Sequence, residues 1–282
     1  MIRLRFLVLS LGLLLSGLAP AAEPVFDVHV HLREGETSLK KFETEARDSG
    51  VSLAGVGAMW FGGPHQAPAG NPGAIRASND GLIALAARHP VVVPIATVHP
   101  YDGQAALDEL ARIAARGVKT LKIHPHTQNF AIADPRVLAL MTKAGELGMT
   151  VLIDNASIVP GDCEDLFNLA FKAPKTRFIF AHMGALNFRY WNILALARTA
   201  DGFALDNVNF DISGIVLLAA GSPIEKEFVW TLRNVGIDHV LIGSDYPQIS
   251  LARTVEALEK LDLTKEEKAA ILNGNARRIW GR

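Results

Sequence analysis

The sequence has almost no cysteine, and this scarcity limits the kinds of site it can build. Cys163 is the only cysteine among 282 residues. A single thiol cannot form an intramolecular disulfide, even in an oxidising compartment. Zinc sites built from several thiolates are excluded for the same reason. Any metal ion must therefore be bound by His, Asp, Glu or a modified Lys.

The sequence also has no excess of charge of either sign. The 28 Lys and Arg residues and the 29 Asp and Glu residues give a net charge of -1. There is no basic field for a nucleic acid and no polybasic patch for a membrane surface. We therefore expect a small-molecule substrate and no nucleic-acid partner. The sequence does not specify the oligomeric state and is compatible with a homo-oligomer.

Long apolar runs are absent except at the N-terminus. Residues 6–18 are almost unbrokenly apolar; they follow Arg3 and Arg5, and the small residues 19–21 come next. This is the three-part layout of a secretory signal peptide. Because the run is short for a hydrocarbon core of ~30 Å, cleavage after Ala21 is favoured over an uncleaved membrane anchor. We predict a signal peptide at 1–21 and a single domain at 22–282, periplasmic and without stable membrane association after cleavage.

Short apolar runs and longer helical patterns alternate through the rest of the chain. The predicted strands are 25–30, 51–60, 91–98, 118–124, 149–154, 177–182, 207–212 and 239–243. The predicted helices are 81–88, 104–115, 135–147, 223–235, 250–261 and 265–273, and 62–73 is predicted to be a long loop. Continuous apolar strands are typical of a parallel sheet that helices cover on both faces.

This alternation predicts an α/β fold, a (β/α)₈ TIM barrel in one domain. Residues 22–282 have a length typical of such a barrel, and 49% of the chain is hydrophobic, enough for a large core. A doubly wound open sheet is the structural alternative. No glycine-rich dinucleotide or phosphate fingerprint follows the first strand, and this absence favours the barrel.

Polar residues stand where five of the eight predicted strands end. His29 and His31 close the first strand and are two residues apart, so in an extended strand they face the same way. Two such imidazoles can chelate one divalent ion. Two histidines with a purely structural role would give the same sequence pattern. The other four ends carry Lys122 with His124, Asp154, His182 and Asp245. Since reactive groups of a parallel barrel gather at the carboxyl ends of its strands, we predict one site there.

At these residues the sequence resembles the amidohydrolase superfamily, in particular its amidohydrolase-2 group of metal-dependent hydrolases and decarboxylases. The resemblance rests on five ordered motifs and a closing segment. These are Asp27-Val28-His29-Val30-His31, Leu121-Lys122-Ile123-His124-Pro125, Phe180-Ala181-His182-Met183-Gly184, Phe210-Asp211-Ile212-Ser213-Gly214, Gly243-Ser244-Asp245-Tyr246-Pro247 and residues 271–278. It covers nearly all of 22–282.

The resemblance implies a role for each strand-end residue. It makes His29, His31 and Asp245 metal ligands, with Asp245 also accepting a proton from metal-activated water. His182 becomes a second-metal ligand or an electrophilic group. Lys122 is a carboxylated bridging lysine or, more modestly, binds a substrate anion. His124 and Arg189 are predicted to bind the substrate near the mouth, although a purely structural role fits both equally well.

The fifth strand departs from the family pattern, which usually places a ligating histidine at its end. Here the position is Asp154. A carboxylate can still bind zinc, manganese or magnesium, so Asp154 is predicted to be a ligand or a direct neighbour of the ion. The expected cofactor is one divalent metal, zinc before manganese, and a second metal is left open.

Three functions follow from these observations. The first is hydrolysis of a small ester, lactone or amide by metal-activated water, with Asp245 and His182 as catalytic residues. The second is non-oxidative decarboxylation of a small carboxylic acid. The third is a non-catalytic binding protein on a degenerate barrel, which only Asp154 supports. Release of carbon dioxide separates the first two, and metal analysis tests the third.

Overall fold

The computed structural model describes residues 23–61, 66–200 and 205–281, and the predicted signal peptide lies outside these ranges. Eight strands form one sheet in sequence order, each parallel to the next. The strands are β1 (Val25–His31), β2 (Leu53–Met59), β3 (Val92–Thr97), β4 (Thr120–Ile123), β5 (Thr150–Ile153), β6 (Arg177–Phe180), β7 (Val208–Asp211) and β8 (Val240–Leu241). All eight predicted strands are confirmed, most of them one to three residues shorter at an end.

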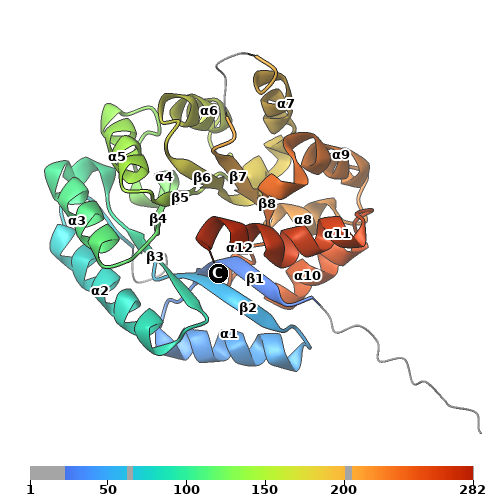
Figure 1. Cartoon of the computed structure of the whole chain (residues 1–282), viewed down its shortest axis with the longest axis horizontal. Coiled ribbons are helices and arrows are strands. Elements are labelled where there is room, and N and C mark those ends of the chain that lie inside the picture. Colours follow the sequence, from blue (N-terminus) through green and yellow to red (C-terminus); the bar gives the residue numbers. More distant parts are fainter. Residues whose placement is uncertain (1–22, 62–65, 201–204, 282) are drawn as a thin grey trace, which may run out of the picture.

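Helices surround this sheet (Figure 1). They are α1 (Glu36–Asp48), α2 (Pro72–Arg88), α3 (Gln104–Ala115), α4 (Pro125–Gln128), α5 (Pro135–Glu146), α6 (Asp162–Lys172), α7 (Ile193–Ala197), α8 (Ile215–Ala219), α9 (Glu225–Val235), α10 (Leu251–Lys260), α11 (Lys265–Ala269) and α12 (Asn275–Trp280). The helix predicted for 81–88 begins earlier, at Pro72, because Asn71 caps it by accepting from the Ala74 N–H. The predicted loop 62–73 therefore cannot extend beyond Asn71, and its residues 62–65 lie outside the described ranges.

The sheet closes into a barrel where β1 meets the segment after β8. The Val28 N–H donates to the Ile242 carbonyl (3.1 Å), and the His31 N–H donates to the Tyr246 carbonyl (2.8 Å). Val30 and Tyr246 form a parallel bridge between the same two segments. The predicted (β/α)₈ architecture is therefore confirmed, and the open doubly wound sheet is excluded.

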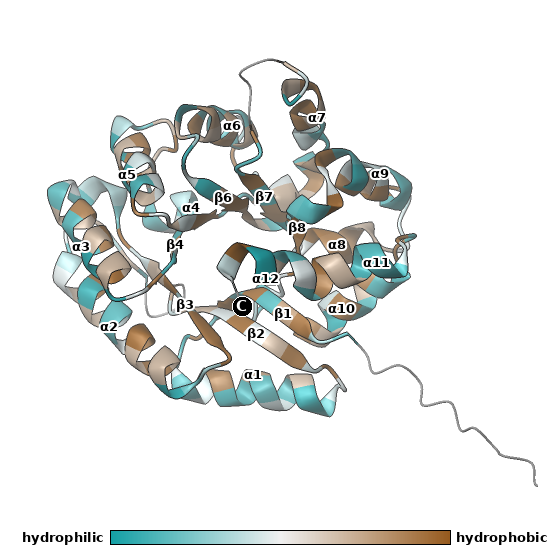
Figure 2. Cartoon of the chain, viewed as in Figure 1, coloured by the Kyte–Doolittle hydropathy of each residue, from teal (hydrophilic) through white to brown (hydrophobic). Residues whose placement is uncertain are grey.

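The strands are buried on both sides, as their apolar runs predicted. Every residue of β4, β5 and β7 is buried. Figure 2 shows apolar colour concentrated in the strands and mixed colours along the outer helices. In α1 the buried residues are Leu39, Phe42 and Ala46, the spacing of a helix with one face on a core. No described helix is both long and apolar enough to span a membrane.

A small apolar cluster inside the barrel joins strands that are not neighbours. Phe26 and Val28 of β1 belong to it together with Leu152 of β5, and Trp280 of α12 packs against Phe26 with ring centroids 5.0 Å apart. A Cβ on Gly55 would come within 2.4 Å of the Phe26 ring, so glycine leaves the room that this ring needs. Because these residues come from the first half of β1, the end of β1 is left free to carry polar groups.

Candidate metal centre

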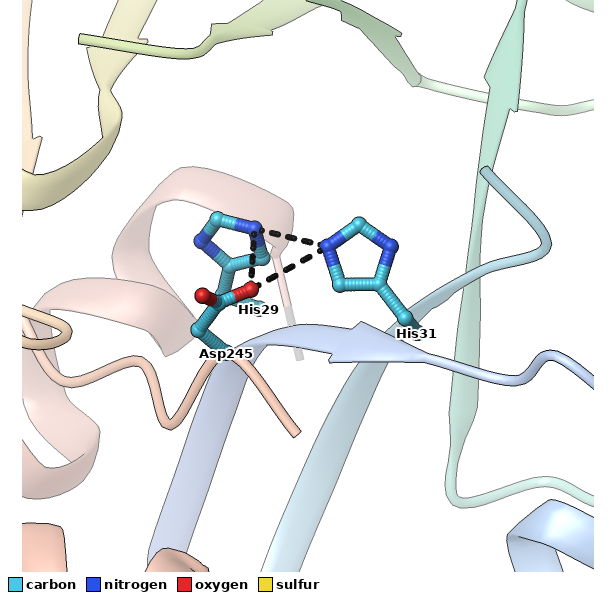
Figure 3. Close-up of side chains that lie close together, drawn as sticks. All are labelled: His29, His31 and Asp245. Carbon is cyan, nitrogen blue, oxygen red and sulfur yellow. Dashed lines mark hydrogen bonds and ion pairs between the residues drawn. The ribbon is translucent and has the colours of Figure 1, made fainter. Parts of the chain in front are cut away.

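Three side chains, two from β1 and one from the segment after β8, converge on one point where the barrel closes. His29 and His31 belong to β1, and Asp245 follows β8. The two Nε2 atoms are 3.2 Å apart, and Asp245 Oδ1 lies 3.5 Å from His29 Nε2 and 3.3 Å from His31 Nε2 (Figure 3). Among the residues that the structure describes, these three form the group with metal-ligand spacing. The structure thus brings together the first-strand pair and the eighth-strand carboxylate.

The Nδ1 atoms of both imidazoles donate hydrogen bonds to oxygen acceptors. His29 Nδ1 donates to Asp211 Oδ2 (2.9 Å), and His31 Nδ1 donates to the Phe61 carbonyl. A ring nitrogen that donates in this way fixes the tautomer, so the Nε2 atom of a neutral ring keeps its lone pair. Burial, followed by the nearby Lys122 charge, lowers the pKa of His29 to about 4, which keeps this ring neutral near pH 7.

The donor set of this cluster fits a divalent cation. Two unprotonated Nε2 atoms and the ionised Oδ1 of Asp245 are all acceptors, so none of the three can donate a hydrogen bond to another. Burial opposes ionisation of Asp245, but its contact with His31 and the neighbouring imidazoles lower its pKa overall. Imidazole nitrogen and carboxylate oxygen are ligands of zinc and manganese. His29, His31 and Asp245 are the residues that would hold such an ion.

Asp211 and Ser213 support the cluster from the end of β7, and the sequence did not single them out as site residues. Asp211 Oδ1 accepts from the Ser213 N–H (2.8 Å) and from the Ser213 hydroxyl, while Oδ2 accepts from His29. Burial would raise the pKa of Asp211, but the contact with His29 and the Ser213 hydrogen bond lower it. A carboxylate near the end of the seventh predicted strand, followed two residues later by a serine, was the available signal in the sequence.

A second cluster lies beside the first and is centred on Asp154. Its Oδ1 atom is 3.2 Å from His182 Nε2 and 3.5 Å from His124 Nε2. Asp154, predicted to be a ligand or a direct neighbour of the ion, is therefore not among the three converging groups of the first cluster. It bridges two histidines instead.

His182 is held between acceptors on both sides of its ring. Nε2 faces the Asp154 carboxylate, and Nδ1 lies 3.1 Å from the Ser213 carbonyl oxygen and 2.9 Å from its hydroxyl. A carboxylate and a carbonyl only accept, so both ring nitrogens must carry hydrogen to satisfy them. Burial opposes this charge, but Asp154 and the other carboxylates raise the pKa of His182 to about 9. At neutral pH the ring is an imidazolium.

His124, unlike His182, stays neutral. Its Nδ1 accepts from the Thr127 N–H (3.3 Å), which leaves Nε2 as the donor towards Asp154. Burial lowers the pKa of His124 to about 3, against the attraction of Asp154. The ring stacks on Phe61 with centroids 5.7 Å apart. His124 can therefore offer one N–H to the site and no charge.

Lys122 lies between the two clusters and has no access to solvent. Its Nζ atom is 3.4 Å from His29 Nε2, and burial lowers its pKa despite the carboxylates of Asp154, Asp211 and Asp245. An amine in this position can bind an anionic group that reaches the cluster. Its place agrees with the position predicted from the sequence.

Both clusters open into a cavity of about 660 Å³ at the carboxyl ends of the strands. Phe61 and Gln66 line it from the segment after β2, and Thr127 lines it from α4. Arg33, Arg253, Ile158 and Leu218 also line it, and the sequence had not singled out any of them.

The structure does not bring Arg189 to this cavity. Its Nε donates to Glu227 (2.7 Å) and its NH1 group to the Leu186 carbonyl (3.0 Å). The guanidinium is thus satisfied on the outer side of the barrel, towards α9. Sequence position alone could not show this, because Arg189 follows β6 in an irregular segment, Ala181–Asn192, whose course is set by residues with positive φ.

Comparisons with solved structures show the same fold at low identity. The 5-carboxyvanillate decarboxylase of Sphingomonas paucimobilis has 19% identity and a TM-score of 0.68, over 86% of this chain and 82% of that chain. The 2,6-dihydroxybenzoate decarboxylase of Rhizobium has 17% identity and a TM-score of 0.63, over 87% and 88%. The 5-carboxyvanillate decarboxylase of Novosphingobium aromaticivorans, solved with manganese, has 18% identity and a TM-score of 0.65, over 86% and 80%.

A search of curated proteins gave no match. The family model described as Amidohydrolase, of the amidohydrolase-2 group, matches residues 26–282, which include every strand and both clusters. The resemblance drawn from the strand-end motifs is therefore confirmed. The chain belongs to the amidohydrolase family.

Proposed function

We propose that this protein is a metal-dependent decarboxylase that removes carbon dioxide from a small carboxylic acid without oxidation. The observation that carries the proposal is His182, which Asp154 and Ser213 hold as a proton donor beside a three-ligand metal site. Its ring centroid lies 5.3 Å from that of His29. A proton donor, an anion-binding lysine and a metal site are the groups that this reaction needs.

The reaction balances with the groups of this chain. The carbon–carbon bond to the carboxylate breaks, its electron pair stays on the substrate carbon, carbon dioxide leaves, and that carbon takes a proton from His182. A divalent ion held by His29, His31 and Asp245 would bind substrate oxygen atoms and stabilise negative charge on them. Lys122 and the His124 N–H would bind the anionic group, and Asp154 would keep His182 oriented and protonated.

Decarboxylation is preferred to hydrolysis because the site is better equipped to give a proton than to take one. His182 is already protonated, and Asp245 Oδ2 accepts from Gln248 Nε2 (3.1 Å). The three solved structures compared above are named as decarboxylases, and one holds manganese. Manganese therefore joins zinc as a metal to be tested first. Hydrolysis of an ester, lactone or amide is the second candidate because Asp245 lies against the metal site, where a base would be needed.

We expect the manganese- or zinc-loaded protein to release carbon dioxide from at least one member of a panel of hydroxybenzoic and enol acids. The measurement is carbon dioxide evolution with and without chelation of the metal, and the product must carry hydrogen where the carboxylate was. Turnover of esters, lactones or amides with no decarboxylation would favour hydrolysis. If metal analysis finds no ion, and added zinc or manganese restores no activity, the binding-protein hypothesis is favoured.

Export is proposed on the N-terminal segment alone, which lies outside the described residues. Its two arginines, apolar run and small residues fit a cleaved signal peptide. We expect the periplasmic fraction to hold a protein that starts at Ala22, which intact mass or N-terminal sequencing would show. A full-length protein retained in the membrane fraction would contradict this expectation.

A further inference from the structure

Arg33 lines the cavity, and its side chain has no hydrogen-bond or ion-pair partner among the described residues. It stands two residues after His31, and its side chain is half-buried. The Nε atom is out of contact with solvent and makes no hydrogen bond with the described residues. A buried donor without an acceptor costs about 1–3 kcal/mol, and more when it is charged. A protein keeps such a group when something else supplies the acceptor.

Arg33 differs in this from the arginines that form ion pairs, although Arg253, which also lines the cavity, shares the lack of an ion pair among the described residues. Arg112 binds Glu109 and Asp80, Arg233 binds Glu267, and Arg189 binds Glu227, each through contacts of 2.7–2.9 Å. Arg33 has no ion pair with any carboxylate in the part of the chain that the structure describes. Within the described ranges its charge is thus unpaired, and the side chain lines the cavity.

We propose that Arg33 binds a second anionic group of the substrate, a carboxylate that the reaction does not remove. The substrate would then be a dicarboxylic acid, with one carboxylate at the metal site and the other at Arg33. This inference rests on the proposed decarboxylation. The planar guanidinium matches a carboxylate through two parallel hydrogen bonds, a geometry that a lysine cannot reproduce.

The remaining walls of the cavity indicate the body of this acid. Ile215, Leu217 and Leu218 line it from the segment of α8, and Ile158 lines it from the loop after β5. Ile158 and Leu218 are 68% and 56% exposed, so apolar surface faces the opening. An apolar or aromatic body between two carboxylates would cover this surface while its ends met the metal site and Arg33.

The test compares ligands that cannot react. Calorimetry on the metal-loaded protein would measure Kd for benzoate and for the three benzenedicarboxylates, ortho, meta and para. We expect at least one dicarboxylate to bind about tenfold more tightly than benzoate or better, the gain of one charge-assisted hydrogen-bonded pair. We call this difference in Kd between the dicarboxylate and benzoate the gap. Arg33→Gln should abolish the gap and leave the affinity for benzoate unchanged. Arg33→Lys should restore only part of it.

Two control variants test whether the affinity difference depends on Arg33. Arg189→Gln removes a guanidinium outside the cavity and should keep the full gap. Arg253→Gln removes the other arginine of the lining and should also keep it. The inference is overturned if no dicarboxylate binds more tightly than benzoate, or if the gap survives Arg33→Gln. If the protein releases carbon dioxide but binds dicarboxylates no more tightly than benzoate, only this inference is overturned. If it binds a dicarboxylate more tightly but decarboxylates no substrate, only the proposed reaction is overturned.

Discussion

Replacing both His29 and His31 with alanine is expected to remove the bound metal and reduce kcat/KM by roughly 10³-fold or more. Substitution of an outer partner of a metal ligand typically costs 10–100-fold, and loss of two ligands should exceed that. The reason lies in the convergence of their Nε2 atoms with Asp245 Oδ1, within 3.2–3.5 Å of one another. Without the imidazoles, Asp245 alone cannot hold an ion at this point.

The measurements are elemental analysis of the purified variant and turnover of the best substrate. His29→Ala also leaves the Asp211 carboxylate without its imidazole, which can weaken folding because a buried charge loses its partner. His31→Gln with Asp245→Asn therefore serves as a second variant that leaves His29 and Asp211 in place. His89→Ala is the control, since that histidine lies outside the cavity and contacts Glu36. Full activity in a metal-free double variant would contradict the mechanism.

The fold could be predicted from the sequence because its strands are buried on both faces. A continuous apolar run such as 178–180 indicates a strand without knowledge of its neighbours, and all eight strands were predicted. Barrel closure could not be derived this way, because it depends on contacts between β1 and residues 242–246, far apart in sequence. Six of the described helices were not predicted, namely α1, α4, α6, α7, α8 and α12. In α1 the spacing of Leu39, Phe42 and Ala46 was present but lay among polar residues.

The site was predictable to the extent that a barrel gathers its strand ends. This rule placed His29, His31, Lys122 and Asp245 in one region without any knowledge of side-chain contacts. Strict alternation along β1 was a less secure guide. The pairing register of β1 with β2 shifts between Asp27 and Val30, and the interior apolar cluster contains Phe26 and Val28. The two histidines converge nonetheless.

The sequence could not show which polar residues bind one another. Asp154 was expected to be a ligand or a direct neighbour of the ion because its strand end usually carries a ligand, and the structure places its carboxylate against His124 and His182. Arg189 was expected at the mouth, yet Glu227 lies within reach on α9. Arg33 drew no attention because an arginine after a strand is commonly paired. These outcomes depend on distances between separate elements, which residue type and spacing do not encode.

Asp154→Asn is expected to reduce kcat about 10- to 100-fold while the protein keeps its metal. The substitution retains one oxygen acceptor but removes the negative charge that holds His182 protonated. A loss of this size is typical of a residue that orients another functional group. The metal should stay because Asp154 is not one of the three groups with ligand spacing, which are His29, His31 and Asp245.

Asp162→Asn is the matched control for this substitution. Asp162 is also buried and also lies against a histidine, with its Oδ2 atom 3.0 Å from His126 Nε2, but neither residue lines the cavity. Its replacement should leave kcat and metal content unchanged, so the two variants separate loss of a carboxylate–histidine pair in general from loss of this one.

Elemental analysis of the Asp154→Asn variant decides what Asp154 does. If Asp154→Asn loses metal in parallel with activity, Asp154 is a ligand, as its strand end implied. If metal stays and kcat falls with little change in KM, Asp154 acts through His182, and the unusual carboxylate of the fifth strand serves proton donation rather than metal binding.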